Sequence, residues 1–99
     1  MKITLSSANV TPVTAEYKGD TFTFDILNFT IQQQVEYESI VKQCIKEKLV
    51  MSDLHKRQFE YAIKNCTLKD AVNVLPYNDI RKIIKIAEDL NNGIDEKKS

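Results

Sequence analysis

Apolar and polar residues alternate along the first third of the chain. A period of two places one side of a strand on a core and the other side in solvent. The Lys-Gly-Asp sequence at 18–20 predicts a hairpin turn between two such strands, because glycine readily takes the positive φ that these turns require. Pro12 cannot donate to a sheet ladder, so the first strand either begins there or runs along an edge. A further short strand at 2–5 is an open alternative. The apolar positions of the two strands are Val13, Ala15, Tyr17, Phe22, Phe24 and Ile26.

The stretch from Thr30 to Leu49 has the pattern of a long amphipathic helix. Thr30 and Gln33 have the spacing of a capping box, in which the threonine oxygen accepts from the Gln33 amide and the glutamine side chain reaches back. No Gly or Pro interrupts the stretch, and mixed steps of three and four residues predict one apolar face. That face is expected to consist of Ile31, Val35, Ile40, Val41, Cys44 and Ile45.

Helical spacing returns twice between residues 52 and 75. A helix over 52–66 is expected to begin at Ser52 as its N-cap. In the segment over 67–75, Thr67 and Asp70 repeat the spacing of a capping box. These two segments are either separate helices or one helix with a bend.

The last helix is expected from about Tyr77 to Asn91. Pro76 sets its start, because proline disfavours the α conformation in the residue before it. Gly93 is a natural residue to end it, and the polar stretch over 94–99 is expected to fray. The apolar face of this helix is expected to consist of Ile80, Ile83, Ile84, Ala87 and Leu90.

Together these elements predict an α+β fold. An N-terminal antiparallel hairpin, with a third short strand as the open alternative, is followed by three to four amphipathic helices. A single domain over 1–93 with a tail over 94–99 is expected, and no internal repeat or linker divides the chain.

Three apolar residues do not fit the expected core faces. Ile86 lies about a quarter turn or more away from the apolar face of the last helix, Tyr77 stands at that helix's start, and Tyr37 lies off the main stripe of the central helix. One interpretation is a slightly wide core stripe. The sharper one is that Tyr37, Tyr77 and Ile86 are partner-binding residues, on the rim of a groove or flat patch where another helix docks.

Charge and composition exclude several classes of function. The 99 residues include 14 Lys and Arg and 14 Asp and Glu, a balance that argues against binding duplex nucleic acid through a basic face. The apolar runs are far shorter than the ~20 residues of a spanning helix, and the first residues lack the apolar core of a secretory signal. We therefore expect a cytoplasmic protein with no membrane partner.

Few side chains are placed for catalysis or metal binding. His55 is the single histidine and falls in the first turn of an expected helix, as a solvated side chain. Cys44 and Cys66 are too far apart for a CxxC motif and take apolar positions, so core packing is expected. One histidine with two distant cysteines does not make a metal site, and two glycines do not make a phosphate loop. We expect no enzymatic activity, no metal and no cofactor.

The helix pair over 52–75 supplies the alternative from another class. A small DNA-binding or DNA-packaging accessory protein could contact phosphate through Lys56, Arg57, Lys64 and Lys69. Against it, the junction at 65–67 lacks the small-residue turn usual in a helix-turn-helix motif. Overall neutrality also removes most of the electrostatic attraction, so nucleic acid is the less favoured partner.

The order of the parts resembles a known family. The hairpin YKGDTFTFDI at 17–26 passes through LNFT at 27–30 directly into a Gln-rich helix start, and LPYNDI at 75–80 leads into a lysine-rich amphipathic helix and a charged tail. This order is similar to that of the small tail assembly chaperones and related minor tail proteins of long-tailed phages and prophages of low-GC bacteria. The similarity covers nearly the whole chain.

The resemblance implies a binding protein without catalysis. Proteins of this family coat the long, helical, aggregation-prone tape measure protein until the tail tube polymerises around it. The implied partners are therefore the tape measure protein, the tail tube protein and a second copy of the chain, and the implied location is the host bacterial cytoplasm. Because the family has no catalytic motif, the resemblance assigns no catalytic residue.

Overall fold

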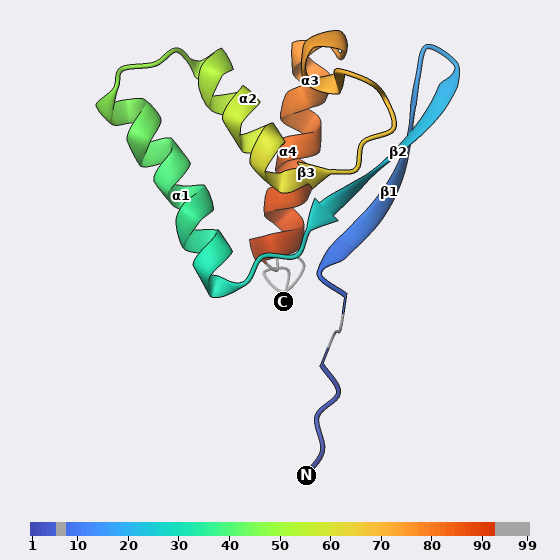
Figure 1. Ribbon diagram of the computed structural model, residues 1–99, viewed down its shortest axis with the longest axis vertical. Coiled ribbons are helices and arrows are strands. Elements are labelled where there is room, and N and C mark those ends of the chain that lie inside the picture. Colours follow the sequence, from blue (N-terminus) through green and yellow to red (C-terminus); the bar gives the residue numbers. More distant parts are fainter. Residues whose placement is uncertain (6–7, 93–99) are drawn as a thin grey trace, which may run out of the picture.

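The computed structural model describes residues 1–5 and 8–92, and it has the α+β architecture predicted from the sequence. Figure 1 shows α1 at one side of the molecule and the β1–β2 hairpin at the opposite side, with α2 and α4 between them. Gly93 and the expected tail over 94–99 lie outside the described residues. The elements in chain order are β1 (Val10–Tyr17), β2 (Asp20–Leu27), α1 (Ile31–Lys46), α2 (Met51–Ala62), β3 (Ile63–Lys64), α3 (Ala71–Val74) and α4 (Tyr77–Asn92).

The hairpin forms where the alternation predicted it. Lys18 and Gly19 both have positive φ, 53° and 83°, as the two central residues of a type I′ turn require. The register sets Val13 opposite Phe24 and Ala15 opposite Phe22, so the apolar side chains of both strands share one face. β1 is the edge strand of the sheet β1-β2-β3, which is where a proline such as Pro12 is tolerated.

The third strand comes from a part of the chain that was expected to be helical. α2 ends at Ala62, and Ile63–Lys64 pairs antiparallel with Asp25–Ile26 of β2, whereas residues 2–5 form no strand. Ile63 is buried, because leaving the helix at this point places its side chain against β2. The predicted helix over 52–66 is therefore wrong in its last turn. The observed helix α2 begins at Met51, with Val50 instead of Ser52 as its N-cap.

Thr67 continues this attachment instead of capping a helix. Its amide donates to the Thr23 carbonyl at 2.9 Å, and its hydroxyl oxygen accepts from the Thr23 amide at 2.8 Å. Asp70, which precedes α3, has a left-handed φ of 58° and makes no side-chain cap bond. The predicted capping box at 67–70 is therefore wrong, and α3 is a single turn.

The core lies between the sheet and the helices. Ile26 is fully buried at its centre, and α4 contributes four buried residues. Leu90, expected in the apolar face of α4, is 49% exposed. At 100° per residue, Asn91 lies closer to the centre of the buried face than Leu90 does. The buried side chains that form one cluster are Phe22, Phe24, Ile26, Tyr37, Phe59, Ala62, Ile63, Ala71, Leu75, Ile80, Ile83, Ile84 and Ala87.

Both ends of α1 are fixed by local hydrogen bonds. The predicted capping box is present, with the Gln33 amide donating to the Thr30 hydroxyl at 3.1 Å and the Thr30 amide donating to the Gln33 side chain at 3.0 Å. At the other end Lys48 has a φ of 59°. The Lys48 amide bonds the Ile45 carbonyl, and the next amide bonds the Cys44 carbonyl, which is the Schellman arrangement.

The predicted single apolar face of α1 is in fact two opposite faces. Tyr37 and Cys44 are buried, and Ile40 and Val41 are partly covered. By contrast, Ile31, Val35 and Ile45 are 86%, 54% and 71% exposed. At 100° per residue, positions 31, 35 and 45 lie within about 40° of one direction, and positions 37, 40 and 44 lie on the other side. Only the second set is covered by the rest of the described chain.

Candidate functional site

The structure separates the three residues that were predicted to bind a partner. Tyr37 is 5% exposed and belongs to the core, whereas Tyr77 and Ile86 on α4 are 45% and 41% exposed. Ile86 follows Tyr77 by nine positions, which places the two residues about 180° apart around the helix. An exposed docking rim can therefore include Tyr77 or Ile86 but not Tyr37, and the two α4 residues lie on different faces of the helix.

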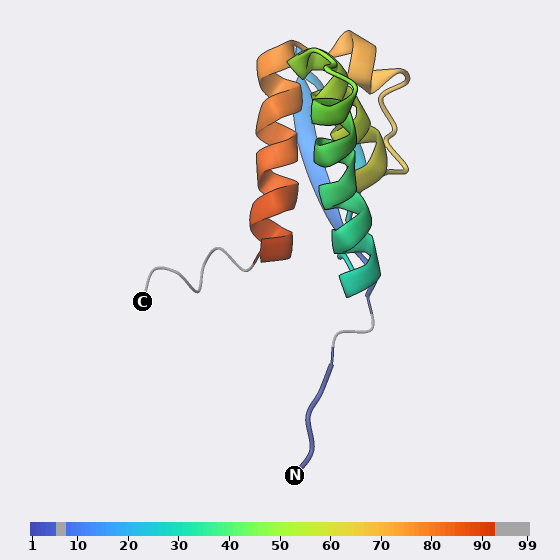
Figure 2. The ribbon, with the colours of Figure 1, turned by 90° about the vertical axis from the view of Figure 1, so that its left-hand side faces the viewer.

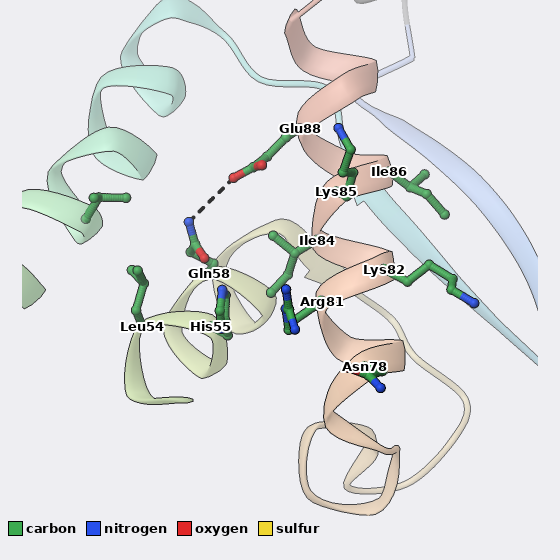
Figure 3. Close-up of a pocket in the computed structure, with 11 residues that line it drawn as sticks. Leu54, His55, Gln58, Asn78, Arg81, Lys82, Ile84, Lys85, Ile86 and Glu88 are labelled. Atoms are coloured by element: carbon green, nitrogen blue, oxygen red, sulfur yellow. Dashed lines mark hydrogen bonds between the residues drawn. The ribbon is translucent and has the colours of Figure 1, made fainter. Parts of the chain in front are cut away.

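One groove lies between α2 and α4. Its volume is about 720 Å³. Figure 3 shows side chains of both helices around it, with Gln58 and Glu88 joined by a hydrogen bond and Ile86 pointing away from α2. The floor is apolar, and charged side chains of α4 surround the opening. Its lining includes Val41, Leu54, His55, Gln58, Arg81, Ile84, Lys85 and Glu88.

A hydrogen-bonded network closes the inner end of this groove. The Tyr37 hydroxyl donates to a Glu88 carboxylate oxygen at 2.9 Å, and the Gln58 amide donates to the same oxygen at 3.5 Å. Burial, followed by the bond to Glu88, raises the pKa of Tyr37 far above its ordinary value. The tyrosine is therefore a fixed donor, and the network ties α1, α2 and α4 together.

Tyr37→Phe should destabilise the protein without unfolding it. The loss of one charge-assisted hydrogen bond is expected to lower the free energy of unfolding by about 1–2 kcal/mol, which lowers the melting temperature by about 5–10 °C. Tyr61→Phe is the matched control, since the bond of Tyr61 to Glu36 is exposed and should contribute less. Thermal unfolding followed by circular dichroism measures both. Equal losses for the two variants would contradict the buried network.

His55 occupies the outer end of the groove. Its Nδ1 is 2.5 Å from the Tyr77 hydroxyl, and the Arg81 guanidinium lies 5.8 Å from the centre of the Tyr77 ring. Burial, with a smaller contribution from Arg81 and against the opposing charge of Glu88, lowers the pKa of His55 below its ordinary 6.5. The sequence predicted a solvated side chain for His55. In the structure this side chain is partly buried, and it holds the Tyr77 hydroxyl.

The lowered pKa of His55 predicts a pH dependence of stability. Below about pH 6.5 the unfolded chain binds a proton at His55 that the folded protein resists, so stability falls as the pH decreases and levels off below the folded pKa. Melting temperatures at pH 7.5 and 5.5 test this for the wild type and for His55→Gln. The variant should lose part of the decrease seen in the wild type. The same decrease in both proteins would show that His55 does not contribute.

A second groove lies between β1 and α4. It has a volume of about 270 Å³, and its floor is formed by apolar side chains of β1, β2 and α4, including Val13 and Ile83. Ile86 lines this groove while remaining 41% exposed. Leu90, one turn further along α4, is 49% exposed. An apolar floor with exposed apolar residues beside it suits the apolar face of a helix better than a small polar substrate.

Several polar side chains around the α2–α4 groove are hydrogen-bonded to other residues of the protein. Glu88 already accepts from Tyr37 and Gln58, and the His55 Nδ1 is held by Tyr77. Within residues 1–5 and 8–92, no group of three or more His, Cys, Asp or Glu residues could hold a metal ion. Cys44 is buried and Cys66 packs against the core.

The helix pair proposed for DNA binding has a different geometry from the one expected. α2 and α3 are separated by residues 63–70, which include β3, and α3 has only four residues. The expected cations, among them Lys56 and Lys69, are exposed, and Arg57 lies 4.0 Å from Glu47. Two short consecutive helices joined by a tight turn are therefore not present in this part of the chain.

Sequence reasoning missed the polar residues that close the inner end of the α2–α4 groove. Gln58 is buried, and it falls four residues after Leu54 and four before Ala62, so its position on the core stripe was visible in the sequence. Nothing in the spacing marked Glu88 as its partner.

None of the helices in the described ranges has the length and apolarity of a membrane span. No family model, curated protein or solved structure with which the chain was compared matches it.

Proposed function

We propose that the protein is a non-catalytic protein-binding module that acts as a phage tail assembly chaperone and holds the tape measure protein in the bacterial cytoplasm. The single observation that carries the proposal is the apolar groove between β1 and α4, with Ile86 and Leu90 exposed beside it. Exposed apolar groups that border an apolar groove are typical of surfaces that bind the apolar face of a helix.

The chemistry of the proposed partner fits this surface. A long helical protein that has not yet been enclosed by the tail tube exposes apolar stripes, which a chaperone must cover reversibly. Half-exposed side chains can cover such a stripe without loss of the fold, since the buried Ile83 maintains the core beside them. The equal numbers of acidic and basic residues leave apolar contact, instead of long-range attraction, as the main source of affinity.

Co-expression with the tape measure protein encoded nearby tests the proposal. We expect the soluble fraction of the tape measure protein to rise severalfold and the two proteins to co-purify. An unrelated soluble coiled-coil protein of similar length serves as the control partner, and it should not co-purify. The absence of both solubilisation and co-purification would overturn the proposed function.

A further inference from the structure

The outer face of α1 carries apolar side chains that no part of the described chain covers. Figure 2 shows α1 in front, on the side of the molecule turned toward the viewer, with α2 behind it. Ile31, Val35 and Ile45 on this face are 86%, 54% and 71% exposed. Such exposure is normal for single residues, but these three lie along one line on the helix.

The line has the spacing of a coiled-coil seam. Steps of four, three, four and three residues connect Ile31, Val35, Glu38, Lys42 and Ile45, which is the alternation of d and a positions in a heptad repeat. The two central positions are charged, with opposite signs, and all five side chains are exposed. Apolar residues therefore lie toward the two ends of the seam, with one acidic and one basic residue at its middle.

We infer that this face binds the same face of a second copy of the chain, with the two α1 helices antiparallel. A twofold axis at the level of residue 40 pairs residues whose numbers sum to eighty. Val35 then meets Ile45 of the second copy, and Glu38 meets Lys42 of the second copy. By symmetry each pair occurs twice. Apolar residues therefore face apolar residues and acidic residues face basic ones at four of the five seam positions, whereas Ile31 falls opposite residue 49, beyond the end of α1.

The charges select this orientation over the parallel one. A parallel pair in register would place Glu38 against the second Glu38, and Lys42 against the second Lys42. Like charges in direct contact disfavour an interface, whereas the antiparallel pair converts both contacts into attraction. The polar pair at the centre also fixes the register, as polar residues in coiled-coil seams do.

The pairing leaves the groove between β1 and α4 free. α1 lies at one side of the molecule and the hairpin at the opposite side (Figure 1), so the β1–α4 groove faces away from the seam. The inference therefore does not depend on the proposed chaperone function. A contact between two helices of 16 residues belongs with small, transient interfaces of less than about 1,200 Å², so a reversible dimer is expected.

Charge reversal tests the pairing. In Glu38→Lys the seam has two lysines facing two lysines, and in Lys42→Glu it has two glutamates facing two glutamates. Each variant alone should raise the dimer dissociation constant at least about tenfold. An equimolar mixture of the two should restore association to within about threefold of the wild type, because every lysine then faces a glutamate. Sedimentation equilibrium measures all of them.

Two controls make the result decisive. Glu60→Lys makes the same charge change on an exposed position of α2 outside the seam and should leave the dissociation constant unchanged. Circular dichroism should show all three variants folded. Mixing does not alter repulsion within one chain, so its rescue reports contacts between chains. A wild type that is monomeric up to about 500 µM, where even transient interfaces are populated, or variants that mixing does not rescue, would overturn the inference.

Discussion

Phe24→Ala should destabilise the protein more than Asn91→Ala or Tyr37→Phe does. Phe24 is 3% exposed, lies opposite Val13, and has its ring centre 6.0 Å from that of Phe22. Removing a buried phenylalanine ring costs about 3–5 kcal/mol, because the free energy gained by burying the ring is lost and a cavity remains. Against a total stability of about 5–15 kcal/mol, the variant should lose a large part of its folded population. Urea unfolding at equilibrium measures the loss.

Thr21→Ala is the matched control for Phe24→Ala. Thr21 lies on β2 and is exposed, so its replacement should change the free energy of unfolding by no more than about 1 kcal/mol. Comparable losses for the two variants would contradict the assignment of the buried face of the hairpin.

Asn91→Ala should have the second largest effect. The Asn91 side chain accepts from the Phe29 amide at 2.6 Å and donates to the Leu27 and Ala87 carbonyls at 3.0 and 2.9 Å. It thereby attaches the end of α4 to the linker between β2 and α1. Alanine leaves partly buried backbone groups without partners, and we expect a loss of about 2–3 kcal/mol.

Its neighbour provides the comparison. Asn92 is exposed, so Asn92→Ala should change stability by less than about 0.5 kcal/mol. Asn91→Asp keeps an acceptor for the Phe29 amide but loses the donor to both carbonyls, and it should fall between the other two variants. Thermal unfolding of the three proteins checks the order. An Asn91→Ala protein as stable as Asn92→Ala would show that the attachment does not matter.

The parts of the fold that local chemistry determines were predictable. The hairpin has a strict period of two and a turn sequence with a glycine where φ must be positive, and both were present in the structure. The capping box at Thr30 and the start of α4 after Pro76 also follow from chemistry within a few residues. Each of these predictions needed no knowledge of distant parts of the chain.

Predictions failed where a distant contact decides the conformation. Ile63 continues a helical pattern in the sequence, but burial against β2 draws it into a strand. Thr67 has the spacing of a helix cap, but its partner is Thr23, 44 residues earlier. In α1, apolar residues on two opposite faces were combined into one stripe, because periodicity alone does not say which of two faces meets the core.

Only part of the candidate site could be predicted from the sequence. Ile86 was identified by its position off the apolar stripe of α4 and Tyr77 by its position at the start of that helix, and both are exposed. Tyr37 was selected in the same way, but Glu88 lies within reach of its hydroxyl and allows it to be buried. Asn91 carried no signal, since its three bonds join segments more than 60 residues apart as well as its own helix.

If the exposed flank of α4 binds a partner protein, as proposed, then Ile86→Glu should remove that binding. Ile86 is 41% exposed, so a glutamate carboxylate can reach water, and the melting temperature should change by no more than about 3 °C. A carboxylate in an apolar interface is costly, so recovery of the tape measure protein with the chain should fall at least about tenfold.

Val74→Glu is the matched control for this measurement. Val74 on α3 is 45% exposed and does not line the β1–α4 groove, so the same chemical change should leave recovery unaltered. The measurement is quantitative pull-down of the co-expressed tape measure protein by the wild type and the two variants, with the melting temperature of each. We predict stable folding of all three and loss of the partner for Ile86→Glu alone. Undiminished recovery by Ile86→Glu, or an equal loss with Val74→Glu, would show that the exposed flank of α4 is not the partner-binding surface.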